Sequence, residues 1–383
     1  MASQTPPSTL EDGLAWFAET FEDVLDETER LCRIPAPTFE EADRAAYVAA
    51  RMQAIGLDDV RIDDIFNATG VLQGDREGPT TLVAAHIDTV FPRTTHLDVR
   101  RNRQRLFGPS IGDNCVAVAA MLSVAAVLRQ RSIPAGRVIF AADVGEEGLG
   151  DLCGIRALLK TWEGQIDTVI AVEGHGLDEV RAAGIGSTRL EITFEGDGGH
   201  SWGAFGTPSA IHAMGSVIHR MSCFNVSQNP KTTFNVGLVE GGESVNTIAS
   251  RASMVIDLRS VDPTYLQDLE KRVEHLLAET EAETGIRILS HVVGQRPAAT
   301  LDLNHPIRQG VNAIRQRLRL RPATFSASST DANLPLSLGI PAICLGITRG
   351  GFAHTVREYI DIAPILAGVK QLYLTILHTL ECR

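Results

Sequence analysis

Arg137-Val-Ile-Phe-Ala-Ala-Asp-Val-Gly-Glu-Glu-Gly148 joins a short apolar run to two adjacent carboxylates. The run is too short for a helix and contains β-branched Val138 and Ile139, so it predicts a buried strand. Neighbouring negative charges repel each other, and burying them is costly unless a cation or a proton compensates. Taken alone, Glu146 and Glu147 would be a solvated acidic turn, so the rest of the chain has to decide what they do.

The composition is that of a globular protein with room for more than one domain. The 383 residues are enough for two domains, and 44% of them are hydrophobic. The formal charge of -12 and the pI near 5.4 argue against nucleic acid and anionic membranes as partners. Six cysteines without a paired CxxC spacing indicate reduced thiols in a cytoplasmic protein rather than a disulfide framework.

The sequence also gives no sign of export or of a membrane span. Residues 1–9 lack the basic and apolar regions of a secretory signal. We find no apolar run as long as the ~18 residues that a spanning helix needs. We therefore expect a cytoplasmic protein that does not bind membranes.

Three further apolar runs resemble the first. Each predicts a buried strand, and each is followed by a side chain that could bind a metal. Residues 80–85 lead to His86 and Asp88, residues 166–172 to Glu173, and residues 341–346 to a loop with His354. In an open parallel sheet the carboxyl ends of the strands share one edge, where sites form. We therefore expect these side chains and Glu146–Glu147 to gather there.

Asp113 joins this group from the start of a helix predicted over residues 115–130. Taken alone it reads as a helix N-cap, but its position places it beside the same sheet edge. The preceding Gly108-Pro-Ser-Ile-Gly112 matches a G-x-S-x-G pattern. A nucleophile elbow needs an apolar strand directly before the serine, whereas the residues here are rich in arginine. Ser110 is therefore a weak nucleophile candidate, and a serine hydrolase is the least favoured alternative.

Beyond residue 185 the pattern changes to the alternation of half-exposed antiparallel strands. The predicted segments are strand 188–194, helix 208–221, strands 232–240 and 252–260, helix 262–284 and strand 286–293. This β-α-β-β-α-β order predicts a ferredoxin-like α+β domain. We predict a catalytic α/β domain, a mostly parallel sheet flanked by helices, from residues 1–185 and 296–383. Residues 186–295 would be inserted into it.

The remaining segments are predicted to complete the catalytic domain. Helices are expected at 10–32, 38–55, 153–162, 305–318 and 363–380, with a strand pair at 60–65 and 68–72 and a polar loop at 325–333. Thr38 would cap the second helix and Gly56 would end it.

Two histidines, three carboxylates and a spare glutamate at one edge suit a site for two zinc ions, since imidazole and carboxylate both bind Zn²⁺. Two metals ~3.5–4 Å apart need one bridging carboxylate and terminal ligands on each side. The motifs resemble the dinuclear zinc metallopeptidase family that includes peptidase T, aminoacylase, glutamate carboxypeptidase and succinyl-diaminopimelate desuccinylase. They are His86-Ile-Asp88, Gly112-Asp113, Glu146-Glu147, Glu173, Gly199-His200, Asn246, Arg259, Thr330-Asp331 and His354 with Glu358. The stretches Gly199-His-Ser-Trp-Gly203 and Ser329-Thr-Asp-Ala-Asn333 favour peptidase T-like members.

The resemblance implies a role for each residue of the metal site. Asp113 would bridge the metals, His86 and Glu173 would complete one zinc, and Glu147 and His354 the other. The expected cofactors are thus two Zn²⁺, with Co²⁺ or Mn²⁺ as alternatives.

The same resemblance implies the catalytic and substrate-binding residues. Asp88 would orient His86, and Glu146 would be the general base that takes a proton from water and returns it to the leaving amine. The inserted domain would mediate a homodimer, and its His200 would donate to a substrate oxyanion in the partner's active site. Asn246 and Arg259 would bind substrate, Arg259 through a carboxylate.

Some positions depart from the family pattern. Asn114 and Cys115 stand where an aspartate and a lysine are common, which leaves metal binding intact but changes the local geometry and charge. Glu173 replaces an aspartate found in many members, and His175 is a rival ligand.

The leading hypothesis is a metal-dependent hydrolase that cuts an amide bond of a small peptide, as a di- or tripeptide exopeptidase. The alternative within the family is an N-acyl amino acid deacylase or a carbamoyl amidohydrolase. A less favoured hypothesis is that the protein is a non-catalytic homologue that binds metal. The expected partners are thus a small peptide or N-acyl amino acid and a second copy of the chain.

Overall fold

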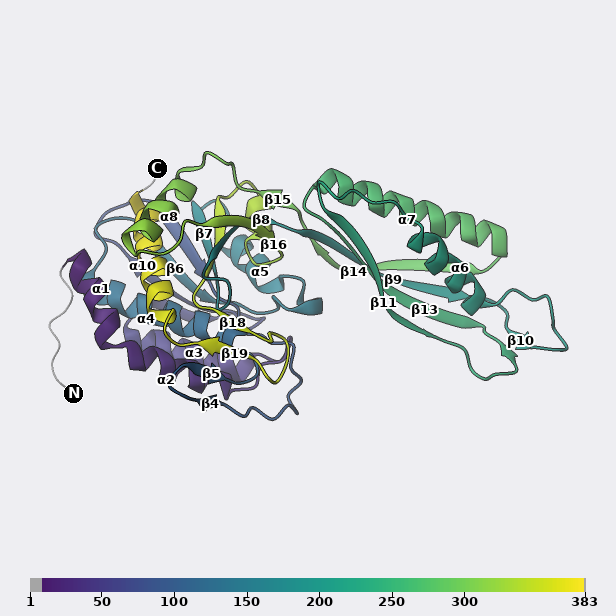
Figure 1. Ribbon diagram of the computed structural model, residues 1–383, viewed down its shortest axis with the longest axis horizontal. Helices are drawn as coiled ribbons and strands as arrows, with labels where there is room; N and C mark the ends of the chain where they lie inside the picture. Colours follow the sequence, from purple (N-terminus) through teal and green to yellow (C-terminus); the bar gives the residue numbers. More distant parts are fainter. Residues whose placement is uncertain (1–8, 382–383) are drawn as a thin grey trace. The chain divides into compact units, whose positions relative to one another are not determined.

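The computed structural model describes residues 9–381, which form two compact units (Figure 1). Residues 9–183 and 300–381 make the larger unit, and residues 184–299 make the smaller one. The prediction that the N-terminus is not a secretory signal concerns mainly residues 1–8, which lie outside the described residues. Cys382 also lies outside them.

The larger unit is built on a mixed sheet with a parallel centre. The strand order is β1-β2-β6-β3-β7-β17-β8-β15, with β16 paired to β8. Its four central strands run parallel: β6 (Arg137–Ala142), β3 (Thr80–Ala84), β7 (Thr168–Glu173) and β17 (Ala342–Gly346). These are the four apolar runs of the sequence, and they are almost entirely buried. The predicted mostly parallel sheet is confirmed.

On either side of this centre the pairing is antiparallel, between β6 and β2, between β2 and β1, and between β17 and β8. The outer strands are β1 (Asp58–Ile62), β2 (Ala68–Gln73), β8 (Glu179–Gly184), β15 (Ala299–Thr300) and β16 (Thr324–Ser328). The sequence predicted the β1–β2 pair but missed β8, and it assigned the region of β16 to a loop. A small separate sheet was also missed, because its strands have only two or three residues: β4 (Arg100–Arg101), β5 (Arg105–Phe107), β18 (Gly350–Gly351) and β19 (Tyr359–Asp361).

Helices cover both faces of the large sheet. The order β6-β3-β7 means that the chain moves in opposite directions through α4 (Val116–Arg131) and α5 (Cys153–Thr161). Because such crossovers are right-handed, these two helices lie on opposite faces. Helix α10 (Ile365–Glu381) packs on α4 and on α8 (Pro306–Arg317), and α5 contacts the short α9 (Asn333–Ser337).

Helix α4 corrects one expectation from the sequence. Residues Ile111–Arg131 contain an 18-residue stretch, with a mean hydropathy of 1.9, that is long and apolar enough to cross a membrane. However, 83% of this stretch is buried inside the protein, as in a core helix. The apolar composition is accounted for because α4 packs on the sheet and also on α2, α3 and α10.

Two helix predictions near the N-terminus were partly wrong. The predicted helix 10–32 is two helices, α1 (Leu10–Glu19) and α2 (Phe21–Cys32), because the chain breaks at Thr20, whose hydroxyl donates to the Trp16 carbonyl. Helix α3 (Ala42–Ile55) begins later than predicted, since the Thr38 hydroxyl donates to Asp88 instead of capping it. It ends as expected at Gly56, which has a left-handed φ of 86°.

The smaller unit has the predicted β-α-β-β-α-β order. Its sheet order is β11 (Thr232–Gly241), β13 (Arg251–Ser260), β9 (Gly186–Glu195) and β14 (Arg287–Arg296), all antiparallel. Helices α6 (Ala210–Ser222) and α7 (Pro263–Thr284) cover the buried face, whose core includes Phe194, Ile256 and Val273. Strand β13 alternates exposed or half-buried with buried residues, as the sequence alternation predicts. The predicted ferredoxin-like domain is confirmed.

Candidate metal centre

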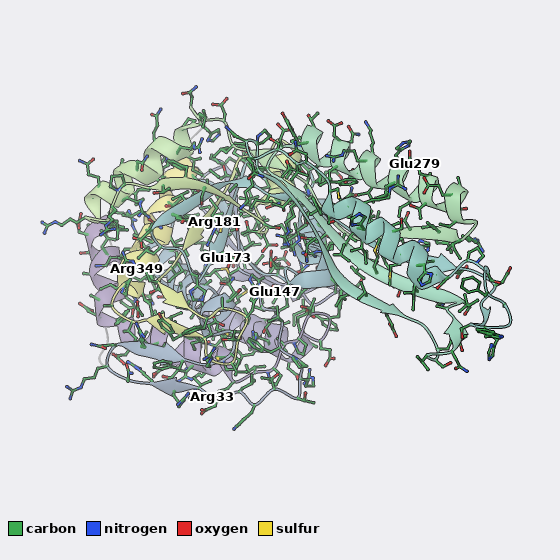
Figure 2. All side chains as sticks on the ribbon, turned by 45° about the vertical axis from the view of Figure 1, so that its right-hand side comes forward. Arg33, Glu147, Glu173, Arg181, Glu279 and Arg349 are labelled. Carbon is green, nitrogen blue, oxygen red and sulfur yellow. The ribbon has the colours of Figure 1, made fainter. Side chains whose placement is uncertain are left out.

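The carboxyl ends of the parallel strands bring the predicted side chains to one edge of the sheet. Glu173 is the last residue of β7, His86 follows β3 by two residues, and Glu147 follows β6 by five. Figure 2 shows Glu147 and Glu173 in the middle of the larger unit, with Arg33 at its periphery. The fourth strand, β17, leads into the loop that carries His354.

Asp113 lies between the two histidines. Its Oδ1 is 3.2 Å from Nε2 of His86, and its Oδ2 is 3.1 Å from Nε2 of His354. The residue sits in a distorted turn, η1 (Ile111–Cys115), with non-helical φ and ψ of -113° and 85°. It is therefore not the simple helix N-cap that the sequence alone suggested. Each carboxylate oxygen faces a different imidazole, which is the arrangement of a bridging ligand.

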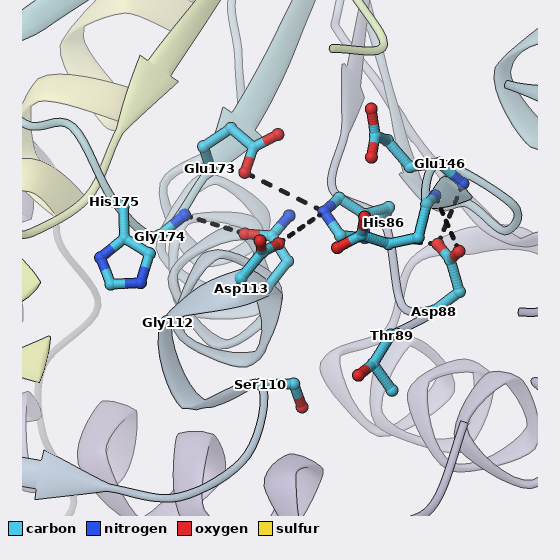
Figure 3. A network of polar contacts seen from close by, with 12 residues as sticks. His86, Asp88, Thr89, Ser110, Gly112, Asp113, Glu146, Glu173, Gly174 and His175 are labelled. Carbon is cyan, nitrogen blue, oxygen red and sulfur yellow. Dashed lines mark hydrogen bonds and ion pairs between the residues drawn. The ribbon is translucent and has the colours of Figure 1, made fainter. Parts of the chain in front are cut away.

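Each histidine also faces a second carboxylate. Nε2 of His354 is 3.1 Å from Oε1 of Glu147, and Nε2 of His86 is 3.9 Å from Oε2 of Glu173. The side chains fall into two sets that share Asp113, one with His86 and Glu173 and one with His354 and Glu147 (Figure 3 shows the first set). One oxygen or nitrogen from each of His86, Asp113 and Glu147 lies within 4.8 Å of the others.

The electrostatics of the two sets fit cations. Burial would lower the pKa of His86, but the carboxylates of Asp113, Asp88 and Glu173 outweigh it and raise this pKa well above its usual value. Hydrogen bonds to Asp113 and Glu147 raise the pKa of His354 to about 10, and burial raises the pKa of Glu173 to about 7. The cluster thus holds protons tightly because it has more negative charge than it can compensate. Divalent cations would replace those protons, and imidazole with carboxylate is a donor set that zinc accepts.

Asp88 connects the two parts of the site. Its side chain is fully buried, and its Oδ1 lies 3.3 Å from Nδ1 of His86, leaving Nε2 to face the centre. It also accepts the backbone N–H groups of Glu146 (3.0 Å) and Glu147 (2.9 Å). Thr38 donates its hydroxyl to the same carboxylate at 2.9 Å. One side chain therefore orients a histidine and also fixes the turn that carries both glutamates (Figure 3).

The departures at Asn114 and His175 have clear explanations. The Asn114 amide donates to the Val172 carbonyl and accepts from the Gly174 N–H, both at 2.8 Å, so it holds the backbone on either side of Glu173. An aspartate could only accept. Nε2 of His175 lies 2.8 Å from Oε1 of Glu358, and Figure 3 shows its ring on the opposite side of Asp113 from His86. His175 therefore contacts Glu358 and belongs to neither of the two side-chain sets.

Ser110 does not have the surroundings of a nucleophile. Its side chain is buried, and its Oγ lies 3.4 Å from Sγ of Cys115 rather than beside an imidazole. Cys32 also lies next to Cys115, at the base of the same turn. Within the described residues, this geometry disfavours the serine hydrolase reading.

The three remaining predicted residues belong to the smaller unit. His200 lies in β10 (Gly199–His200), which pairs with β12 (Thr247–Ile248) next to Asn246. Nδ1 of His200 accepts the backbone N–H groups of Trp202 (3.2 Å) and Gly203 (3.3 Å), so the ring proton is on Nε2. Arg259 instead pairs with Asp257 on the same strand, at 2.6 Å.

A pair of buried acids lies behind the site, of which the sequence motifs included only Asp331, without a role. Asp143 directly follows β6, Asp331 lies in the loop after β16, and the two carboxyl groups interact electrostatically. Burial raises the pKa of Asp143 to about 7 and that of Asp331 well above its usual value. Asp143 is visible in the sequence only as the residue that ends the β6 apolar run.

The fold and the site geometry agree with the comparisons to known proteins. The family model for Peptidase family M20/M25/M40 matches residues 82–378. Uncharacterized protein YqjE of Bacillus subtilis (strain 168) is 25% identical over 366 residues, covering 90% of this chain and 94% of its own. Acetylornithine deacetylase of Myxococcus xanthus is 25% identical over 347 residues, covering 84% and 87%.

The crystal structure of a tripeptidase from Staphylococcus aureus subsp. aureus Mu50 has the same fold, with a TM-score of 0.80 at 21% identity. The match covers 94% of this chain and 98% of the tripeptidase. These findings confirm the resemblance that the sequence motifs indicated. The chain belongs to Peptidase family M20/M25/M40, a family of metal-dependent peptidases and amidohydrolases.

Proposed function

We propose that this protein is a zinc-dependent exopeptidase that cleaves the amide bond of a di- or tripeptide. The observation that carries the proposal is the position of Asp113, whose two carboxylate oxygens face the histidines of two separate ligand sets. Glu146 is next to Glu147 in the sequence, and its backbone N–H donates to Asp88, so Glu146 would serve as a base beside the metals without being one of their ligands.

The roles follow from this arrangement. Asp113 would be shared, His86 and Glu173 would hold one zinc, and Glu147 and His354 the other. When bound, the zinc pair would polarise the scissile carbonyl and acidify a water molecule. Glu146 would take the proton from the attacking water on its carboxylate and deliver it to the leaving nitrogen, which departs as an amine. Asp88 would keep His86 in the tautomer that presents Nε2.

The smaller unit would complete the site in a homodimer. Its edge strand β11 has exposed apolar side chains at Leu238 and Val239, which favours pairing with a second copy. The tautomer of His200 leaves an N–H on Nε2 that can donate to the oxyanion formed at the scissile carbonyl of the partner's substrate. Asn246 and Arg259 would contact the substrate, and Arg259 would first have to leave Asp257. The free cysteines among the described residues are consistent with a cytoplasmic location.

The proposed activity is tested with purified protein and a matched panel of dipeptides, tripeptides, N-acetyl amino acids and N-succinyl amino acids. We expect release of free amino acids from the peptides, loss of this activity with a chelator, and recovery with Zn²⁺ or Co²⁺. Turnover of only the N-acyl compounds would replace the peptidase by a deacylase, the activity named for the Myxococcus relative. Two bound metals without any turnover would indicate a binding protein, and inactivation only by a serine reagent would reject the metal mechanism.

Replacing His200 by Ala should lower kcat by about 10²–10³-fold, the effect of removing one oxyanion donor. Metal content should not change, because His200 is not in either ligand set. His291, an exposed histidine on β14 of the same unit, provides the control, and His291→Ala should keep full activity. Mixing the His200→Ala and Asp113→Ala variants tests the dimer. Mixed dimers contain one complete site, so activity should reappear, and mixtures that stay inactive would contradict a role in the partner's site.

A further inference from the structure

Glu358 has an extensive set of contacts for a residue with no role assigned so far. It lies four residues after His354, and its side chain is fully buried. Its carboxylate accepts three backbone N–H groups from one turn, those of Ser110 (3.0 Å), Gly112 (3.0 Å) and Asp113 (2.8 Å). Hydrogen bonds from backbone N–H groups to a buried carboxylate are charge-assisted and strong.

These three bonds account for the unusual shape of the turn that carries Asp113. Ser110 has a left-handed φ of 63°, and Asp113 is non-helical, so the turn cannot satisfy its own N–H groups as an α-helix does. Glu358 supplies the missing acceptors. The direction of the Asp113 side chain therefore depends on a carboxylate that is more than 240 residues away in the sequence.

His175 holds Glu358 from the other side, with 2.8 Å between Nε2 and Oε1. The packing leaves no spare room around this pair. A Cβ atom on Gly112 would lie 2.3 Å from Nε2 of His175 and 2.7 Å from Oε1 of Glu358, and one on Gly350 would lie 2.5 Å from Cε1 of His175. Glycines at these two positions are thus required for the contact between Glu358, His175 and the turn.

We propose that Glu358, held by His175, is the positioning residue that fixes Asp113 between the two metals. The inference rests on the proposed function in one respect, that Asp113 is the ligand shared by both sets. Because Asp113 faces His86 and His354 at once, an error in its position weakens both metal sites together. Loss of Glu147, which belongs to one set, would instead weaken one.

The test measures metal binding and not catalysis. In Glu358→Gln the amide has the shape of the carboxylate, but only one of its two polar atoms is an oxygen. Its NH₂ group cannot accept, so the N–H donors on that side of the amide lose their partner. We expect the affinity for both Co²⁺ ions to fall by about 10–100-fold, the usual effect of losing a partner behind the ligands. The absorption bands of bound Co²⁺ should shift as well, because the geometry of the shared ligand changes.

A pair of His175 variants provides the conservative comparison. His175→Gln keeps a donor for Glu358 and should retain most of the Co²⁺ affinity, whereas His175→Ala should resemble Glu358→Gln. The control for losing a buried carboxylate is Glu27→Gln on α2, where Glu27 is buried and pairs with Arg51. It should bind both Co²⁺ ions with wild-type affinity.

The proposal is wrong if folded Glu358→Gln binds two Co²⁺ ions with wild-type affinity and spectrum, or loses only one of them. If Glu358→Gln does not fold, equal Co²⁺ affinity in His175→Gln and His175→Ala would overturn the proposal. Failure of the proposed function looks different, because the wild-type protein would then bind two Co²⁺ ions and cleave no peptide.

Discussion

Replacing Glu146 by Gln is expected to leave both metals bound and to lower kcat by about 10²–10⁴-fold, the usual contribution of a general base. The amide has the shape of the carboxylate but cannot take a proton from water. The contact that positions this residue survives the change, because Asp88 binds its backbone N–H rather than its side chain. The turn and the neighbouring ligand Glu147 should therefore stay in place.

The neighbouring residue provides a matched control for this prediction. Glu147→Gln makes the same chemical change one position along the same turn, but Glu147 lies 3.1 Å from Nε2 of His354 in a ligand set. It should lose one metal as well as activity. The two variants are compared by metal analysis of the purified proteins and by kcat on a peptide that the wild type cleaves. Near-normal kcat in Glu146→Gln would show that another group is the base.

The contrast between these two adjacent glutamates also shows what the sequence could reveal. The four central strands were predictable, because each is a short, continuous apolar run of the kind that is buried in a parallel sheet, and parallel strands place the residues after them at one edge. That argument brought Glu146, Glu147, Glu173 and His86 together without any structure. It could not separate a base from a ligand, and the resemblance to a known family supplied that distinction.

The supporting contacts were not predictable, because each depends on a partner far away in the sequence. Thr38 looked like a helix cap, yet its hydroxyl is used by Asp88, 50 residues away. Asp143 meets Asp331 only because β6 and the loop after β16 converge behind the site. Glu358 reaches the Asp113 turn across 245 residues. Local propensity contains no information about such partners, so the sequence indicated the candidate ligands but not these distant contacts.

The shared ligand leads to the second large expected effect, the loss of both metals in Asp113→Ala. Removing this carboxylate leaves His86 with Glu173 and His354 with Glu147, two protein ligands in each set. Catalytic zinc sites normally keep three protein ligands. His354→Ala, in contrast, leaves one complete set of His86, Asp113 and Glu173. Asp113→Ala should therefore retain no metal after gel filtration and have no activity above the uncatalysed background, whereas His354→Ala should keep one metal.

The measurement is metal content by atomic emission on both variants, beside thermal unfolding to confirm that they are folded. Two metals retained in Asp113→Ala would mean that the sets do not share this carboxylate, whatever the activity. A loss of both metals in His354→Ala would mean that the two sites bind only together. In that case the exposed His354, with a side chain that is 54% accessible, would be as necessary for metal binding as the half-buried Asp113. The expected order follows from geometry, because among the described residues of the two sets only Asp113 has an oxygen within 3.2 Å of Nε2 of each histidine.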